Sequence, residues 1–165
     1  MRMISPWRAV RRIHEINLSE LHSEKISVIL VDVDNTLTRG HEDYIAPDAV
    51  SWIEQAKQDG FQVIILSNNR QARVESFARR FSVRGIWNAT KPNPLTYRRV
   101  VKELGAARKE CAAVGDQLFT DILGGNLAGM KTILVDPSSM EEHRWTRFVR
   151  KIEKFVAHRK IQWDE

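Results

Sequence analysis

The sequence contains a single cysteine, Cys111, among its 165 residues. One thiol cannot form an internal disulfide, which excludes the disulfide-stabilised secreted scaffolds and fits a reducing compartment. Cys111 stands in an apolar run, so we expect a buried core residue there and not a nucleophile.

Long apolar segments are also missing. The longest runs, such as 63–66 and 132–135, are far too short to cross a bilayer. The first residues lack the apolar core of a signal peptide. We therefore expect a cytoplasmic protein, free or at the periphery of the inner membrane face. Acidic residues are the minority charge, 21 against 26 Lys and Arg, and the net charge of +5 favours phosphates, nucleic acid or an anionic membrane without choosing among them.

Short apolar runs alternate with amphipathic segments along most of the chain. This alternation predicts an α/β fold, a Rossmann-like three-layer arrangement with a five-stranded parallel sheet and helices on both faces. We expect a single domain over 1–165, with an N-terminal approach helix in 1–25, a catalytic core in 26–136 and a helical tail in 137–165. No insertion is long enough for a full cap domain. The expected strands are 28–31, 61–66, 83–87, 111–114 and 131–135, and the expected helices are 48–58, 71–81, 94–104 and 119–128.

The first expected strand, 28–31, runs directly into Asp32 and Asp34. A buried parallel strand delivers such residues to the carboxyl edge of its sheet, where open α/β folds place their sites. Two carboxylates at this spacing repel each other and favour a cation, and Mg2+ accepts oxygen ligands and binds phosphate at once. The alternative is a simple turn, because Asp and Asn favour turns.

The next two strands end in residues suited to phosphate. Ser67 and Asn68 follow strand 61–66, where a hydroxyl and backbone N–H groups can hold a phosphate oxygen, although both residue types also cap helices. Lys91 follows strand 83–87 in a loop stiffened by two prolines and can act as a point charge, or else is a solvated loop residue.

The fourth strand ends in Gly115 and Asp116, and Asp121 follows near the start of the next helix. Helix capping explains Asp121 well. It does not explain why an apolar strand ends in Asp116, beside the carboxylates of the first strand. These acids therefore complete a candidate cation site at one edge of the sheet.

Taken together, these segments resemble the haloacid dehalogenase (HAD) superfamily of phosphohydrolases over residues 28–135. Its four motifs are matched in order by Asp32 with Asp34, by Ser67, by Lys91, and by Gly115 and Asp116 with Asp121. Residues 32–37, 66–69 and 91–94 further resemble the YqeG-like branch of subclass IIIA. Related eukaryotic members of that branch are phosphatidylglycerophosphate phosphatases.

The resemblance implies a role for each residue. Asp32 is expected to be the nucleophile that forms an aspartyl-phosphate, and Asp34 the general acid and base. Mg2+ would be held by Asp32, the Asp34 carbonyl and Asp116, with Asp121 in support. Ser67, Asn68 and Lys91 would bind the transferred phosphoryl group. The expected function is thus a Mg2+-dependent phosphomonoester hydrolase, with phosphatidylglycerophosphate ranked first. A sugar or nucleotide monophosphate, a nucleic-acid 3′-phosphate, or a non-enzymatic nucleic-acid or protein binding module are the alternatives.

Other parts of the chain bear on partners. A basic helix from Ser5, with Trp7 on its apolar face, would either lie on anionic lipid or dock on its own domain. The stretch 141–160 is expected to form a helix that covers the sheet, and 39–46 a small flap over the site. An open site without a cap suits a large substrate or a neighbouring subunit as lid, so a homo-oligomer is a further expectation.

Overall fold

The computed structural model describes residues 3–38 and 43–136. The helix expected in 141–160 lies outside the described residues, and so do residues 39–42 of the expected flap. The two ends of that flap are described, and Thr38 and Ile45 form an antiparallel bridge at its base. No described helix has both the length and the apolar character that a membrane-spanning segment requires.

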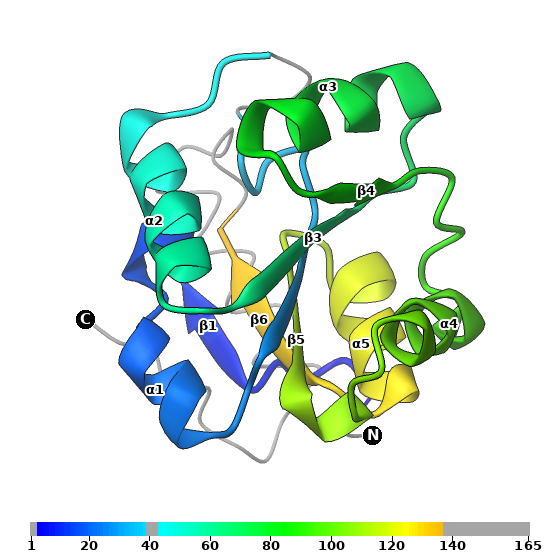
Figure 1. The fold of residues 1–165 in the computed structure, drawn as a ribbon. Helices are drawn as coiled ribbons and strands as arrows, with labels where there is room; N and C mark the ends of the chain where they lie inside the picture. The colour runs from blue at the N-terminus through cyan, green and yellow to red at the C-terminus, as the bar shows by residue number, and fades with distance from the viewer. Residues whose placement is uncertain (1–2, 39–42, 137–165) are drawn as a thin grey trace, which may run out of the picture.

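The centre of the molecule is a parallel sheet of six strands in the order β1-β6-β5-β2-β3-β4 (Figure 1). Every neighbouring pair is parallel, so all strands present their carboxyl ends at the same edge. The inner strands are apolar throughout because both faces of the sheet are covered. The strands are β1 (Arg8–Val10), β2 (Val28–Val31), β3 (Gln62–Leu66), β4 (Arg84–Ile86), β5 (Cys111–Gly115) and β6 (Lys131–Val135).

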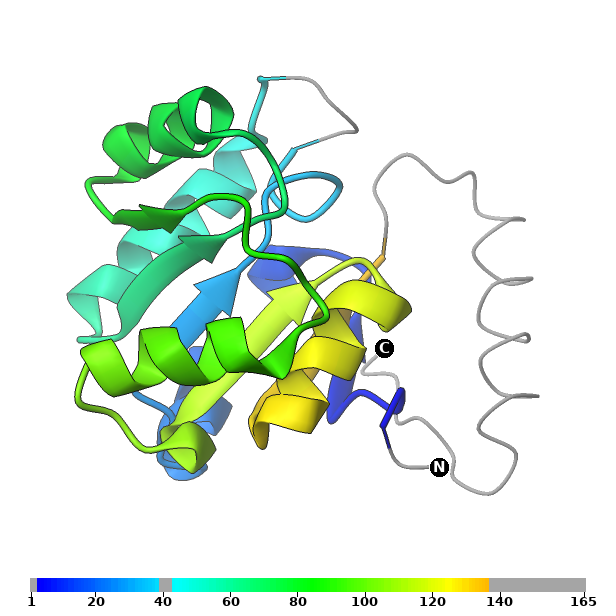
Figure 2. The same ribbon diagram turned by 90° about the vertical axis from the view of Figure 1, so that its right-hand side faces the viewer.

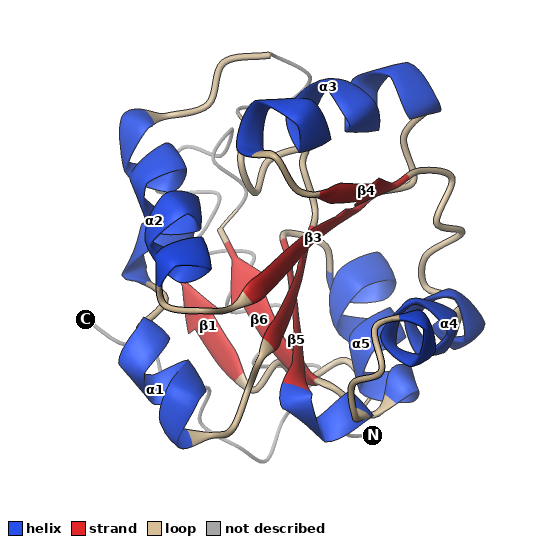
Figure 3. Cartoon of the chain, viewed as in Figure 1, coloured by secondary structure: helices blue, strands red, loops and turns tan. Residues whose placement is uncertain are grey.

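Helices cover both faces of this sheet, which gives three layers (Figures 2 and 3). On one face Trp52, Ile53 and Phe77 belong to the larger apolar core, and on the other Tyr97 and Val100 belong to the smaller one. The helices are α1 (Leu18–Ser23), α2 (Pro47–Gln58), α3 (Gln71–Phe81), α4 (Pro94–Glu103) and α5 (Leu123–Ala128), with short turns η1 (Ile13–Glu15), η2 (Arg108–Glu110) and η3 (Leu118–Ile122).

The predicted fold class is confirmed, with one more strand than the five expected. The bounds of β2, α3 and β6 agree with the prediction to the residue. The helix predicted over 119–128 begins with a π-helical turn, η3, and continues as α5. Regular hydrophobic periodicity therefore placed the core elements well.

The prediction of a helix starting at Ser5 is wrong, because residues 8–10 form the strand β1. Residues 8–10 are extended and pair in parallel with Ile133–Val135, and Trp7 N donates to Thr132 O at 2.8 Å. Without this strand, β6 would leave a row of unpaired backbone groups at the sheet edge. Pairing with that edge overrides the helical pattern of a short segment, whose propensity is a weak force.

Trp7 packs against the chain's own core. Its ring is partly buried against the larger core, and Lys131 Nζ lies 4.2 Å from the ring centroid. The guanidinium of Arg8 stands 4.6 Å from the same centroid. Of the two expectations for the N-terminal segment, the structure supports docking on the chain's own domain.

Candidate active site

Four strand ends and one helical turn bring the predicted residues to the carboxyl edge of the sheet. Asp32 and Asp34 follow β2, and Asp116 follows β5, the strand next to it. Ser67 follows β3, Lys91 follows β4 and its connecting loop, and Asp121 lies in η3. All six side chains are buried, although such residues are usually exposed. The fold therefore gathers residues that are up to 89 positions apart in the chain into one site.

Lys91 is the buried cation of the site. Its Nζ lies 2.6 Å from Asp121 Oδ1 and 2.9 Å from Asp32 Oδ1, and its side chain is only 3% exposed. Burial alone would lower the pKa of Lys91, but the carboxylates of Asp121 and Asp32 outweigh burial and raise it. The lysine is thus held as a charged group, which a phosphoryl-binding residue needs to be.

Three carboxylates stand around a common point. Oxygen atoms of Asp32, Asp116 and Asp121 all lie within 4.8 Å of one another, and all three residues are buried. Asp116 Oδ1 is fully buried and has no hydrogen-bond partner in the described part of the chain. Lys91 neutralises one of these charges, so the trio keeps an excess of negative charge. Hard oxygen donors with an unpartnered atom are the ligand set that Mg2+ takes in proteins.

The crowding of buried carboxylates raises the pKa values of two of them. Burial, and then the charges of Asp121 and Asp32, raise the pKa of Asp116 to about 7. Burial also raises the pKa of Asp121 to about 6, against the opposing effect of Lys91. Perturbed carboxylates in one cluster are typical of functional sites, where a bound cation would relieve the repulsion.

Asp34 is bound by residues of α3 and of the loop before it. Arg73 donates to Asp34 Oδ1 from Nη2 at 2.7 Å and from Nε at 3.1 Å, and Asn69 Nδ2 donates to Oδ2. A third nitrogen of the same guanidinium, Nη1, lies 2.7 Å from Asp43 Oδ1 at the end of the flap. Both oxygens of Asp34 therefore accept bonds from fixed donors beside the carboxylate trio.

Sequence reasoning missed Arg73 and Asn69. The sequence did contain a sign that Arg73 has an acidic partner. Arg73 stands in the first turn of α3, where the helix dipole disfavours a cation. A basic residue at that position needs an acidic partner elsewhere, and Asp34 is that partner. Asn69 carried no comparable signal, because Asn at the start of a helix reads as an ordinary cap.

Ser67 and Asn68 occupy different positions in the site. Ser67 is 2% exposed, and its Oγ accepts a bond from Asn69 N at 3.3 Å. The Asn68 side chain is turned toward the Lys91 backbone: Lys91 N donates to Asn68 Oδ1 at 2.8 Å, and Asn68 Nδ2 donates to Lys91 O at 3.1 Å. The amide of Asn68 thus fixes the loop that carries Lys91, a role that the sequence did not indicate.

Gly115 is required by the close approach of η3 to β5. A Cβ built on Gly115 would lie 2.2 Å from Asp121 Cγ and 2.4 Å from Asp121 Oδ2. No side chain fits there while Asp121 keeps its place beside Lys91. The glycine of the fourth motif therefore serves to admit the carboxylate of Asp121.

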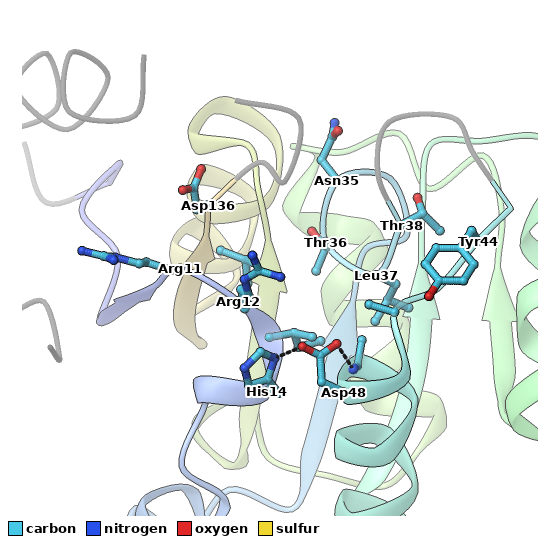
Figure 4. Close-up of a pocket in the computed structure, with 14 residues that line it drawn as sticks. Arg11, Arg12, His14, Asn35, Thr36, Leu37, Thr38, Tyr44, Asp48 and Asp136 are labelled. Carbon is cyan, nitrogen blue, oxygen red and sulfur yellow. Dashed lines mark hydrogen bonds and ion pairs between the residues drawn. The ribbon is translucent and has the colours of Figure 1, made fainter. Parts of the chain in front are cut away.

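A separate pocket lies beside the loop that follows Asp34 (Figure 4). Residues 35–38 form one wall, and Arg12 and Asp136 belong to the opposite side. His14 Nδ1 lies 2.9 Å from Asp48 Oδ2 at its floor. None of the seven predicted site residues lines this pocket, so it is distinct from the carboxylate trio.

Comparison with known proteins gives a consistent result. The model of the haloacid dehalogenase-like hydrolase family matches residues 7–129. A probable phosphatase of Bacillus subtilis, YqeG, is 35% identical over 97% of this chain and 96% of its own length. Phosphatidylglycerophosphate phosphatase 1 of Arabidopsis thaliana is 27% identical over 94% of this chain, which spans 48% of that longer protein.

Solved structures agree on the fold. A protein of Streptomyces avermitilis described as a putative HAD family hydrolase superposes with a TM-score of 0.59 at 18% identity, over 74% of this chain and 78% of its own. The 3-deoxy-D-manno-octulosonate 8-phosphate phosphatase of Moraxella catarrhalis, solved with magnesium and phosphate, gives 0.55 at 16% identity, over 86% of this chain and 98% of its own.

Proposed function

The chain belongs to the haloacid dehalogenase-like hydrolase family and is a phosphatase of that family, and we propose that it hydrolyses a phosphomonoester with Mg2+ through an aspartyl-phosphate. The observation that carries the proposal is the buried trio of Asp32, Asp116 and Asp121 with Lys91 beside it. Carboxylates so placed can hold a divalent cation and leave one oxygen to attack phosphorus.

In the first step, a carboxylate oxygen of Asp32 attacks phosphorus and the bond to the leaving oxygen breaks. Asp34 gives its proton to that oxygen, so an alcohol departs and an aspartyl-phosphate remains. In the second step, water attacks the same phosphorus while Asp34 takes up a proton. Inorganic phosphate leaves, and Asp32 is restored as a carboxylate.

The remaining residues stabilise charge during both steps. Lys91 and the Ser67 hydroxyl are placed at neighbouring strand ends, where they can bind the oxygens of the transferred group. Asp32, the Asp34 carbonyl and Asp116 would hold Mg2+, with Asp121 in support. The ion, when bound, offsets the repulsion between Asp32 and the incoming phosphate.

Among substrates we rank phosphatidylglycerophosphate first. The named activity of the Arabidopsis relative supports this ranking, and so does the lack of a cap domain in the described chain, because an open site suits a phosphate presented at a surface. The net charge of +5 also favours an anionic partner. Sugar phosphates, nucleotides and a nucleic-acid 3′-phosphate are the rivals.

The decisive experiment measures p-nitrophenyl phosphate turnover with Mg2+ for the wild type, Asp32→Asn and Asp34→Asn. We expect turnover in the wild type and a loss of about 10²-fold or more in both variants. Equal rates in all three proteins would overturn the mechanism. A panel of phosphatidylglycerophosphate in mixed micelles, sugar phosphates, nucleotides and a 3′-phosphorylated oligonucleotide then tests the ranking, which falls if the lipid is cleaved no faster than the chromogenic ester.

A further inference from the structure

The most exposed large apolar side chains lie at the active-site edge of the sheet. In the described part of the chain these are Leu95 at 65%, Phe119 at 63% and Tyr44 at 60% exposure. Tyr44 stands in the connection after β2, Leu95 in the first turn of α4, and Phe119 in η3 after β5. We call these three residues the apolar rim.

Contacts tie the apolar rim to the catalytic groups. On one side, Tyr97 OH donates to Thr120 O at 3.3 Å, which joins the first turns of α4 to η3, the elements that carry Leu95 and Phe119. Asp121, in the same turn η3, contacts Lys91. Leu95 and Phe119 therefore stand on two joined elements, one of which carries Asp121 of the buried ion pair.

The other side of the rim is built on the flap. Tyr44 follows Asp43, whose carboxylate is paired with Arg73, and Arg73 in turn holds Asp34. Tyr44 lies beside Thr38, at the base of the flap (Figure 4). The three apolar side chains thus come from three elements far apart in the sequence, and not from one local hydrophobic segment.

Exposed cations share this edge. Arg11 and Arg12 follow the carboxyl end of β1, and Arg70 follows that of β3 at the start of α3. All three are exposed residues. Single exposed apolar side chains need no explanation, but apolar and basic side chains at one edge of the sheet are the composition of a surface that contacts anionic lipid.

We propose that this edge of the sheet is a membrane-contact surface, in which the apolar rim enters the lipid interface and Arg70 and Arg12 contact anionic headgroups. The inference rests on the proposed function and narrows its substrate class to a phosphomonoester carried on a lipid headgroup. Asp32 follows β2 at the same edge, so a headgroup phosphate would approach it from the bilayer surface. Trp7, which lies against Lys131, has no part in this contact.

A second copy of the chain is the main rival occupant of the rim, because a neighbouring subunit can also cover a capless site. The two occupants differ in their response to charge. A lipid surface rich in phosphatidylglycerol attracts each well-placed cation by about fivefold in affinity. An interface between two copies would not depend on the charge of the added vesicles.

The test is co-sedimentation of the full chain with phosphatidylcholine vesicles, with and without phosphatidylglycerol, in the absence of substrate. We expect the wild type to bind the anionic vesicles. Leu95→Ser and Phe119→Ser should each lower the partition coefficient by about tenfold. Arg70→Gln should lower it about fivefold, and only on anionic vesicles. Met3→Ser is the matched control, since Met3 is 53% exposed but lies near Asn126, outside the rim, and should change nothing.

Two results would overturn the inference. One is vesicle binding by the Leu95→Ser/Phe119→Ser double variant equal to that of the wild type, or an equal loss in Met3→Ser. The other is a wild-type dimer in sedimentation velocity that the double variant abolishes, which would assign the rim to a second copy. Vesicle binding needs no turnover, so a failure here leaves the hydrolase proposal standing, whereas loss of p-nitrophenyl phosphate turnover would not by itself remove the lipid contact.

Discussion

Arg73 and Asp34 form the contact that joins the candidate acid–base residue to α3. Two nitrogens of Arg73 share one carboxylate oxygen of Asp34, at 2.7 and 3.1 Å, while Asn69 donates to the other oxygen. A third nitrogen reaches Asp43 on the flap. The position of Asp34 is therefore set by donors from α3 and its preceding loop, and Arg73 is a positioning residue for it.

Replacing Arg73 by Gln should impair proton delivery more than binding. An alkyl phosphate needs a proton on its leaving oxygen, whereas p-nitrophenolate leaves without one. We expect kcat/KM to fall about tenfold or more for an alkyl phosphate and less than about threefold for p-nitrophenyl phosphate. The ratio kcat/KM is the right measure, because it reports the steps up to departure of the leaving group and not the later hydrolysis of the aspartyl-phosphate.

Arg80→Gln is the matched control for this prediction. Arg80 is exposed on the same helix, so the charge change is the same without a contact to Asp34. Arg73→Lys should recover part of the alkyl phosphate activity, since it keeps the charge but loses the paired donors. A uniform loss on both substrates would show that Arg73 acts on the fold and not on Asp34.

Asp116→Asn should stabilise the metal-free protein. Burial and the neighbouring acids raise the pKa of Asp116 from 3.8 to about 7, so the folded protein at pH 8 carries a carboxylate that it disfavours. The amide resembles the protonated carboxyl and avoids that cost. With EDTA at pH 8 we expect Tm to rise by roughly 5 °C, on a scale of 2–4 °C per kcal/mol.

The way in which the Tm gain of Asp116→Asn changes with pH provides the control. The raised pKa means that the folded state binds a proton between about pH 7 and pH 4 that the unfolded chain does not. The penalty in the wild type is therefore complete above pH 7 and declines as the pH falls, so the gain from Asp116→Asn should be smaller at pH 5 than at pH 8. Added Mg2+ should raise the Tm of the wild type and not that of the variant. An equal gain at both pH values would contradict the assignment.

The sequence predicted the core of this fold because its elements are long or strongly patterned. The helix α3 and the strands β2 and β6 have the predicted bounds, since each buries a regular apolar pattern. It failed at β1, a strand of three residues whose conformation is set by its pairing with β6. A strand that forms because it pairs with a distant segment has no pattern in its own sequence that would predict it.

The site shows the same division. Asp32, Ser67 and Asp116 directly follow predicted strands, and Lys91 lies in the loop after one. The convergence of these residues was predictable because a parallel sheet brings strand ends to one edge. The contacts among side chains were not found. That Asn68 binds the Lys91 backbone depends on the relative placement of two loops 23 residues apart, which no spacing rule fixes.

Asn68 supplies a graded test of that contact. Asn68→Ala removes both hydrogen bonds to the Lys91 backbone, whereas Asn68→Asp keeps the acceptor for Lys91 N and loses the donor to Lys91 O. Because each such bond contributes about 1 kcal/mol, we expect inhibition by inorganic phosphate to weaken about fivefold in the Asp variant and about 25-fold in the Ala variant. An Ala variant that binds phosphate as well as the wild type would show that the clamp does not position Lys91.

Gly115→Ala should displace Asp121 and so disrupt the site from within β5. The new methyl carbon would lie 2.2 Å from Asp121 Cγ, and real Cβ atoms do not approach this closely, so η3 must shift. The shift would break the 2.6 Å contact between Asp121 and Lys91 and leave a buried cation with one partner fewer. We expect a loss of Mg2+-dependent turnover of about 10²-fold or more together with a lower Tm, as for the loss of a buried ion-pair partner.

Asp121→Gly removes the obstructing side chain and serves as the partner in a double-mutant cycle. If the clash is the cause, Gly115→Ala should cost much less stability in the Asp121→Gly background than in the wild type. Additive losses of Tm would show that Gly115 is needed for the backbone of β5 and not for the place of Asp121.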